Sequence, residues 1–273
     1  MTNFELVKEI ESALDCENAD FEAKQMVLFA LDVDNTQFIK IKRDSASQEV
    51  VEKCFDMARR RNEGTPLYYI LGKAEFYSLP FLVGEGVLIP RDDTEILVDE
   101  ALKCLEGLKN PRVLDLCSGS GAIAIAIAKN RADAEVVAVE LYDEAFKFLN
   151  KNIQLNGVLN VKPIQADALN FIEDEFDLIV SNPPYISFCE KPDLQKEVLN
   201  EPLTALFAND DGYEFYEKIS ENYKNGKRFT LLFEIGYTMS DKVCEILYNK
   251  GYSNISKIED FNGIIRVIKA QKE

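Results

Sequence analysis

The segment with the clearest chemical character is one where an apolar run ends in a polar residue and two prolines. Residues 176–181 have the pattern of a buried strand, and Asn182-Pro183-Pro184-Tyr185 follows directly. The strand would deliver Asn182 to its carboxyl end, while the prolines stiffen the loop and leave carbonyls without competing N–H donors. The Asn182 side-chain oxygen and the Pro183 carbonyl could then each accept one N–H bond of a bound group.

A glycine-containing turn follows another predicted strand, at 111–116, and leads into an apolar helix. Glycines let a ligand approach the backbone, and the amide groups of the helix N-terminus face that ligand. The turn also fits the dinucleotide fingerprint in its G-x-G-x-x-A form, so the ligand at this turn could be a nucleotide or a nucleoside. The residues of this turn are Cys117, Ser118, Gly119, Ser120 and Gly121.

Three acids accompany successive predicted strands: Asp115 in the first, Glu140 at the end of the second and Asp167 after the third. The carboxyl ends of parallel strands form the edge where open α/β sheets bind ligands. A carboxylate beside the glycine turn repels a pyrophosphate but suits an ammonium group, which S-adenosylmethionine carries. Glu140 would accept ribose hydroxyls and Asp167 would meet the adenine amino group. The acids therefore favour S-adenosylmethionine over NAD.

Asn182 to Tyr185 is similar to a motif of methyltransferases that act on planar nitrogens: adenine N6, guanine N2 and the glutamine amide. Such a nitrogen is a poor nucleophile because its lone pair is delocalised. Two carbonyl acceptors would hold its N–H bonds, turn the lone pair toward the sulfonium methyl and stabilise the developing positive charge. Tyr185 would pack on the planar group. No strong base is needed, which suits a chain with no histidine.

The elements that position these residues alternate between helix and strand after residue 90. This alternation predicts βαβ units and a mostly parallel sheet with helices on both faces. The last two strands, at 253–259 and 263–269, are joined by a short turn at Asn262-Gly263, which favours an antiparallel edge hairpin. The expected fold class is α/β, a Rossmann-like class I S-adenosylmethionine-dependent methyltransferase with a small N-terminal helical bundle.

Residues 3–73 show helical periodicity, with Asp20 and Ser47 where N-caps would begin the second and third helices. Short β-prone runs broken by proline and glycine follow, as in a connecting hairpin. The expected organisation is a helical substrate-recognition domain at 1–72, a β-hairpin linker at 73–90 and a methyltransferase domain at 91–273.

Composition restricts the function further. The 273 residues carry a formal net charge of −17, which argues against nucleic acid as the main ligand. Arg59-Arg60-Arg61 is expected to be a solvated last turn of a helix. The six cysteines form no C-x-x-C pair, and the amphipathic, acidic start does not resemble a signal peptide. We expect a cytoplasmic monomer with no metal site and no membrane contact.

The chain resembles peptide chain release factor N5-glutamine methyltransferases, the HemK-type family, over nearly its full length. The resemblance implies methyl transfer from S-adenosylmethionine to the glutamine of a Gly-Gly-Gln loop in class I release factors, supporting translation termination. Besides the motifs above, it rests on residues 65–72, Glu75-Phe76-Tyr77, 87–91 with Thr94-Glu95, Glu201-Pro202, Ala205-Leu206, Asp211-Gly212 and Glu234-Ile235-Gly236.

Carried onto this sequence, the resemblance predicts a cofactor site from Cys117 to Gly121, Glu140, Asp167 with Ala168, and Asn182. It predicts substrate contacts at Asn182, Pro183, Pro184 and Tyr185, with Arg91 and Glu95 either in the site or fixing the linker. Ala168 stands where the family often has an aromatic residue, so adenine stacking must come from elsewhere. A ribosomal-protein glutamine methyltransferase, a nucleic-acid base methyltransferase and a nucleotide-dependent dehydrogenase are the alternatives.

Overall fold

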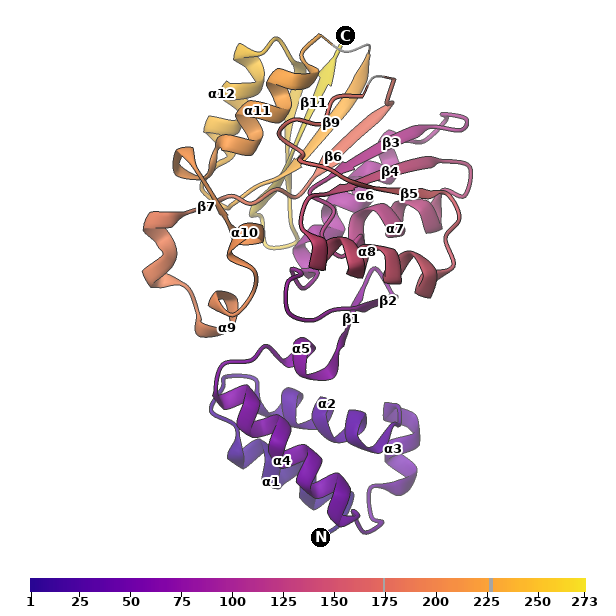
Figure 1. The fold of residues 1–273 in the computed structure, drawn as a ribbon, viewed down its shortest axis with the longest axis vertical. Helices are drawn as coiled ribbons and strands as arrows, with labels where there is room; N and C mark the ends of the chain where they lie inside the picture. The colour runs from indigo at the N-terminus through magenta and orange to yellow at the C-terminus, as the bar shows by residue number, and fades with distance from the viewer. Residues whose placement is uncertain (174, 226–227) are drawn as a thin grey trace. The chain divides into compact units, whose positions relative to one another are not determined.

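The computed structural model describes residues 1–173, 175–225 and 228–273, which divide into two compact units (Figure 1). The first unit comprises Met1–Gly72 with Gln195–Asn200, and the second Lys73–Leu194 with Glu201–Glu273. The predicted methyltransferase range of 91–273 differs at 195–200. This segment belongs to the first unit because Asn200 Nδ2 donates to the Gly64 carbonyl at 2.9 Å and Glu197 pairs with Arg61.

The first unit is a helical bundle around an apolar core that includes Leu6, Ile10 and Met26. Ser47 caps α4 as predicted, accepting from the Val50 N–H at 3.3 Å. The prediction for Asp20 is wrong, because Asn18 is the N-cap of α2 and Asp20 lies in the first turn of the helix. The helices are α1 Asn3–Ala13, α2 Ala19–Leu31, α3 Asn35–Ile41, α4 Gln48–Asn62, α5 Leu67–Leu71 and α9 Lys196–Leu199.

The last turn of α4 holds a buried ion pair that the sequence did not predict. The Arg61 side chain is only 9% exposed, and its guanidinium donates to Glu22 at 2.5 and 3.0 Å and to Glu197 at 2.8 Å. Arg59 on the same helix is 59% exposed and pairs with Asp56. The three arginines therefore do not form the solvated turn that was expected.

A seven-stranded sheet organises the second unit, in the order β10-β11-β9-β6-β3-β4-β5. The five strands from β9 to β5 are parallel, while β11 and β10 run antiparallel at one edge. The predicted fold class is confirmed. The strands are β3 Arg112–Leu116, β4 Glu135–Glu140, β5 Val161–Gln165, β6 Leu178–Ser181, β9 Phe229–Glu234, β10 Ser253–Glu259 and β11 Ile265–Lys272.

Helices cover both faces of this sheet (Figure 1). On one face α6, α7 and α8 pack on residues such as Val113, and on the other α11 and α12 pack on residues such as Leu114. Successive strand residues thus point to opposite layers, which is why the strands are apolar throughout. The helices are α6 Glu95–Cys104, α7 Ala122–Asn130, α8 Asp143–Asn156, α11 Glu214–Tyr223 and α12 Ser240–Asn249.

Short elements complete the second unit. The predicted hairpin is present and pairs Phe76 with Leu79. None of the helices in the described part of the chain is both long and apolar enough to cross a membrane. The short elements are β1 Lys73–Phe76, β2 Leu79–Leu82, β7 Ile186–Ser187, β8 Phe207–Ala208, α10 Leu203–Leu206 and the 3-10 helices η1 Asp92–Thr94, η2 Phe188–Asp193 and η3 Asp210–Gly212.

Candidate functional site

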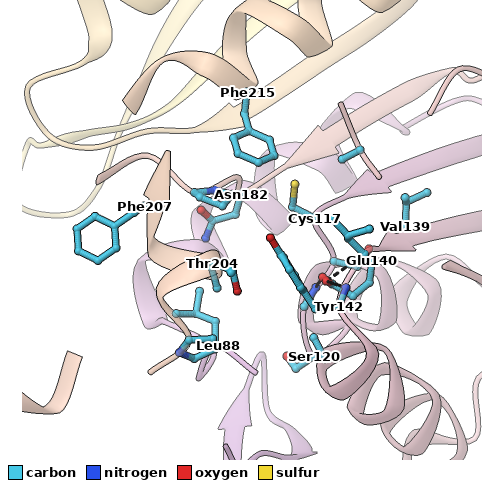
Figure 2. Close-up of a pocket in the computed structure, with 18 of the residues that line it drawn as sticks. Leu88, Cys117, Ser120, Val139, Glu140, Tyr142, Asn182, Thr204, Phe207 and Phe215 are labelled. Atoms are coloured by element: carbon cyan, nitrogen blue, oxygen red, sulfur yellow. Dashed lines mark hydrogen bonds between the residues drawn. The ribbon is translucent and has the colours of Figure 1, made fainter. Parts of the chain in front are cut away.

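A cavity of about 570 Å³ lies within the second unit, where the parallel strands end. Figure 2 shows Cys117, Tyr142 and Asn182 approaching this space from three different segments of the chain. The predicted site residues that line it are Arg91, Cys117, Ser118, Gly119, Ser120, Glu140, Asp167, Ala168, Asn182 and Pro184.

The glycine turn is held by side chains from neighbouring segments. The Gly119 N–H donates to Glu140 at 2.8 Å, and Asn152 Nδ2 donates to the Ser120 carbonyl at 2.9 Å. Gly121 does not line the cavity and has a structural reason to be glycine. Its φ is +85°, and a Cβ there would lie 2.5 Å from Leu149 Cδ1.

Glu140 ends β4 and receives several backbone N–H groups. Its Oε1 accepts from Leu141 and Tyr142, both at 2.9 Å, and its Oε2 accepts from Gly119. Burial raises the pKa of Glu140, and these donors oppose that rise. A carboxylate has about four acceptor positions, so about one remains for a ligand.

Asp115 lies behind the glycine turn and does not line the cavity. Its side chain is fully buried, with Oδ2 accepting from the Ala124 N–H at 3.2 Å and Oδ1 without a partner. Burial raises its pKa to about 7. The predicted contact between Asp115 and the ammonium group of a ligand therefore has no support from the position of this side chain.

Asn182 reaches the cavity from the end of β6, and the described contacts orient its amide. Its Nδ2 donates to Thr94 Oγ1 at 3.2 Å, and Thr94 is itself only 4% exposed. Both residues line the cavity. With Nδ2 directed at Thr94, the Asn182 side-chain oxygen remains available to accept a hydrogen bond.

The other members of the Asn-Pro-Pro-Tyr motif behave differently from one another. Pro184 lines the cavity, whereas Pro183 and Tyr185 do not. The Tyr185 ring approaches Gly236, and burial raises its pKa to about 12. A Cβ at Gly212, whose φ is +90°, would lie 2.1 Å from the Tyr185 carbonyl oxygen. Packing of Tyr185 on a substrate amide thus stays a prediction without geometric support.

Arg91 and Glu95 separate into two roles. Arg91 lines the cavity and pairs with Glu201, whose other oxygen accepts from the Ile89 N–H at 3.0 Å. Glu95 does not line the cavity and accepts from the Tyr77 N–H at 2.6 Å. Glu95 therefore joins the turn of the hairpin to the first residue of α6.

The charges around the cavity test which ligand it suits. Three acidic residues line it, Glu140, Asp167 and Glu214, while Arg91 is the one basic residue among its described lining. Because Arg91 is already paired with Glu201, the wall carries an excess of negative charge. Such a wall repels a pyrophosphate and suits a ligand with an ammonium and a sulfonium group.

Family models match both units of the chain. Residues 93–210 match the Methyltransferase small domain, and residues 5–72 match the PrmC N-terminal domain. A release factor glutamine methyltransferase of Thermodesulfovibrio yellowstonii is 36% identical over 257 residues, covering 92% of both chains. The chain belongs to the release factor glutamine methyltransferase family. The corresponding protein of Fusobacterium nucleatum is 41% identical over 84% of this chain and 67% of its own.

Among solved structures, the hMettl16 catalytic domain bound to an RNA hairpin is similar in fold, with a TM-score of 0.58 at 15% identity. That match covers 70% of this chain and 75% of the other. At this identity the likeness shows the methyltransferase fold alone.

The structure adds lining residues that sequence reasoning missed. Tyr142 is 45% exposed and extends into the space between Asn182 and Glu140 (Figure 2). Tyr142 is the N-cap residue of α8, but its side chain makes no capping hydrogen bond to the helix. Phe188 and Phe207 also line the cavity, with stacked rings 5.0 Å apart. Thr94 was part of a quoted motif, but nothing in the sequence marked Tyr142.

Proposed function

We propose that this chain transfers the methyl group of S-adenosylmethionine to the side-chain amide nitrogen of a glutamine in the Gly-Gly-Gln loop of class I peptide chain release factors. The observation that carries the proposal is the Asn182 amide, which is hydrogen-bonded to Thr94 in the wall of a cavity whose charged lining residues are mostly acidic. The names of the relatives support the same substrate.

S-adenosylmethionine would lie along the carboxyl ends of β3, β4 and β5. The turn from Cys117 to Gly121 would border its amino-acid part, and Glu140 would take one ribose hydroxyl on its remaining acceptor position. Asp167 accepts from the Leu169 N–H at 2.9 Å and the Asn170 amide at 2.6 Å, which leaves acceptor capacity for the adenine amino group.

Tyr142 would supply the aromatic surface that Ala168 lacks. Both residues line the same cavity, and the Tyr142 ring extends into it (Figure 2). An aromatic ring offset-stacked on adenine contributes about 1–3 kcal/mol in comparable base contacts. This assignment removes the difficulty raised by the small side chain at Ala168.

When bound, S-adenosylmethionine supplies an electrophilic methyl group on a positively charged sulfur. The Asn182 side-chain oxygen would accept one N–H of the substrate amide and help to hold its lone pair toward that methyl. The motif predicts the Pro183 carbonyl as the second acceptor, although Pro183 does not line the cavity. The nitrogen gains positive charge as the bond forms, and two fixed carbonyl dipoles stabilise it without reorganisation. Holding the two reactants in line contributes a further 7–11 kcal/mol or so.

Release factor recognition needs more than the cavity, because one glutamine side chain offers too few contacts for selectivity. The helical unit at 1–72 is the proposed recognition element, and Arg91 is the proposed charged contact at the cavity wall.

Deleting residues 1–72 should raise KM for release factor while leaving S-adenosylmethionine affinity near its full-length value. An unchanged KM for a folded truncated enzyme would contradict the recognition role.

Parallel reactions with labelled S-adenosylmethionine test the proposal. Purified class I release factor, ribosomes and DNA are offered separately, with the Asn182→Ala variant as the matched negative control. Label should enter release factor and depend on Asn182. Preferential labelling of a ribosomal protein or of DNA would replace the assignment with one of the alternatives.

A further inference from the structure

Glu234 is the last residue of β9, and Asn182 directly follows the last residue of β6. The two strands are parallel and pair Ser181 with Phe233, so Asn182 and Glu234 are the next residues along two adjacent strands. They end at the same edge of the sheet. Glu234 does not line the cavity, whereas Asn182 does. A carboxyl group thus lies directly behind the residue assigned to the substrate amide.

The Glu234 carboxyl group is buried next to two polar residues of the cavity wall, Thr94 and Asn182. Its residue is 4% exposed, and Oε2 has no hydrogen-bond partner. Interactions with the side chains of Thr94 and Asn182 lower its pKa, so both side chains lie close to it. Since Asn182 Nδ2 donates to Thr94 Oγ1, the three side chains form one polar cluster.

The charged and titratable groups around Glu234 come from four further segments. Asp93 precedes Thr94 and pairs with Arg266 of β11 at 2.8 Å. Arg266 also pairs with Asp260 at 3.1 Å, so its charge is shared. Tyr185 lies nearby, and the Tyr216 hydroxyl donates to the Glu234 backbone carbonyl at 2.9 Å rather than to its carboxyl group.

A carboxylate carries no hydrogen, so it accepts only from the NH₂ end of an asparagine. With that NH₂ turned toward Glu234 and Thr94, the Asn182 oxygen is the end left for a substrate N–H. The reversed amide would place an oxygen against the carboxylate and an NH₂ against the substrate N–H. Neither contact could form a hydrogen bond.

We propose that Glu234 is a positioning residue that, with Thr94, holds the Asn182 amide with its nitrogen turned inward and its oxygen toward the substrate glutamine. The assignment rests on the proposed methyl transfer, because it explains how the acceptor oxygen is oriented before substrate binds. It adds Glu234 and Thr94 to the site without giving either of them contact with the reacting atoms.

This arrangement makes methyl transfer sensitive to pH. Burial raises the pKa of Glu234 to about 7, and the interactions with Thr94 and Asn182 oppose that rise. Below that pH the protonated acid carries an O–H that can donate to the Asn182 oxygen, so the amide loses its preferred orientation. The rate constant kcat should therefore rise as pH increases through about 7.

Three variants separate positioning from general stability. Glu234→Leu removes the polar interactions of the carboxyl group, whereas Glu234→Gln keeps an acceptor of the same shape but cannot ionise. Glu100→Gln is the matched control, since Glu100 is also a buried glutamate and pairs with Lys269 at 2.9 Å away from the cavity. It should leave kcat, its pH profile and cofactor binding unchanged.

We expect Glu234→Leu to lower kcat about 10- to 100-fold, the loss expected for a hydrogen bond to a charged group. Affinity for S-adenosylhomocysteine should stay within about threefold, because Glu234 lies outside the cavity. Glu234→Gln should fall between wild type and leucine and lose the pH dependence near neutrality. If the leucine variant does not fold, the glutamine variant carries the test alone.

A measurement without substrate keeps this inference separate from the proposed function. In nitrogen-15 NMR, the signal lost in Asn182→Ala identifies the Asn182 amide group. That signal should titrate near pH 7 in the wild type and in Glu100→Gln, and stay constant in Glu234→Gln. The inference would be overturned if the Asn182 signal of Glu234→Gln titrated as it does in the wild type. It would also be overturned if a folded Glu234 variant kept the wild-type kcat and pH profile. Absence of any methyl transfer by wild type would instead refute the proposed function.

Discussion

Replacing Glu140 with glutamine should weaken S-adenosylhomocysteine binding through a countable loss of acceptor positions. In the wild type three backbone N–H groups, from Gly119, Leu141 and Tyr142, occupy all but about one of the carboxylate's four positions. The remaining position can accept one ribose hydroxyl directly. Glutamine has a single oxygen, and its NH₂ group would face at least one of these N–H donors.

The expected magnitude follows from the charge on the acceptor. A hydrogen bond to a charged group contributes about 1.5–3 kcal/mol, which corresponds to a loss in affinity of about 10- to 150-fold. Because only one hydroxyl is accepted, the 2′-deoxy and 3′-deoxy forms of S-adenosylhomocysteine should differ. One should bind the wild type about as tightly as the parent compound, and the other about tenfold or more weakly.

Isothermal titration calorimetry can measure these affinities, with circular dichroism to establish folding. Glu135→Gln is the matched control, because Glu135 begins the same strand, is exposed and does not line the cavity. It should bind like wild type. In Glu140→Gln the difference between the two deoxy compounds should largely disappear. Equal losses for both compounds in the wild type, or Glu140→Gln binding within about threefold of wild type, would refute the acceptor count.

Three further predictions concern catalysis and stability. Asn182→Ala should lower kcat by about 10²- to 10³-fold, measured by single-turnover methyl transfer, while cofactor affinity measured by calorimetry stays nearly the same. Asn182→Asp should also have a low kcat, because it adds a negative charge beside the sulfonium. Arg61→Ala should lower the free energy of unfolding, measured in urea, by about 3–5 kcal/mol because it leaves the buried Glu22 unpaired. Arg59→Ala, at an exposed position of the same helix, should lower it by about 1 kcal/mol or less, and equal losses would contradict the burial of Arg61. Asp115 has a pKa of about 7 in the folded protein against an ordinary value of 3.8, so its contribution to stability falls as pH rises between these values. Asp115→Asn should therefore raise the free energy of unfolding by up to about 4 kcal/mol near pH 8 and change it little near pH 4. A gain that does not depend on pH would contradict this assignment.

The sequence predicted the sheet and the segments that reach the cavity because both depend on local patterns. Parallel apolar strands all end at the carboxyl edge of the sheet, so the residues at their ends lie there regardless of the surrounding packing. These residues are Cys117–Gly121, Glu140 and Asn182. Asp115 was assigned by type alone. The alternation along β3 places it with Val113, on the face that α7 covers, so periodicity could have predicted its buried position.

Other features were less accessible or not accessible at all. Helix α3 was missed although Asp34 and Gln37 form a capping box that the sequence displays. The orientation of Tyr185 was not predictable, because it depends on the approach of Gly212 and Gly236 from distant segments. The burial of Arg61 likewise depends on Glu197, more than a hundred residues away in the chain.

Tandem mass spectrometry of a class I release factor, after incubation with this enzyme and S-adenosylmethionine, tests the central claim most directly. A single methyl group should appear on the side-chain amide nitrogen of the glutamine in the Gly-Gly-Gln loop. It should be absent when that glutamine is replaced or when the enzyme carries Asn182→Ala. A methyl group on any other residue of the release factor, or none on a folded release factor while ribosomal protein or DNA is methylated, would contradict the account.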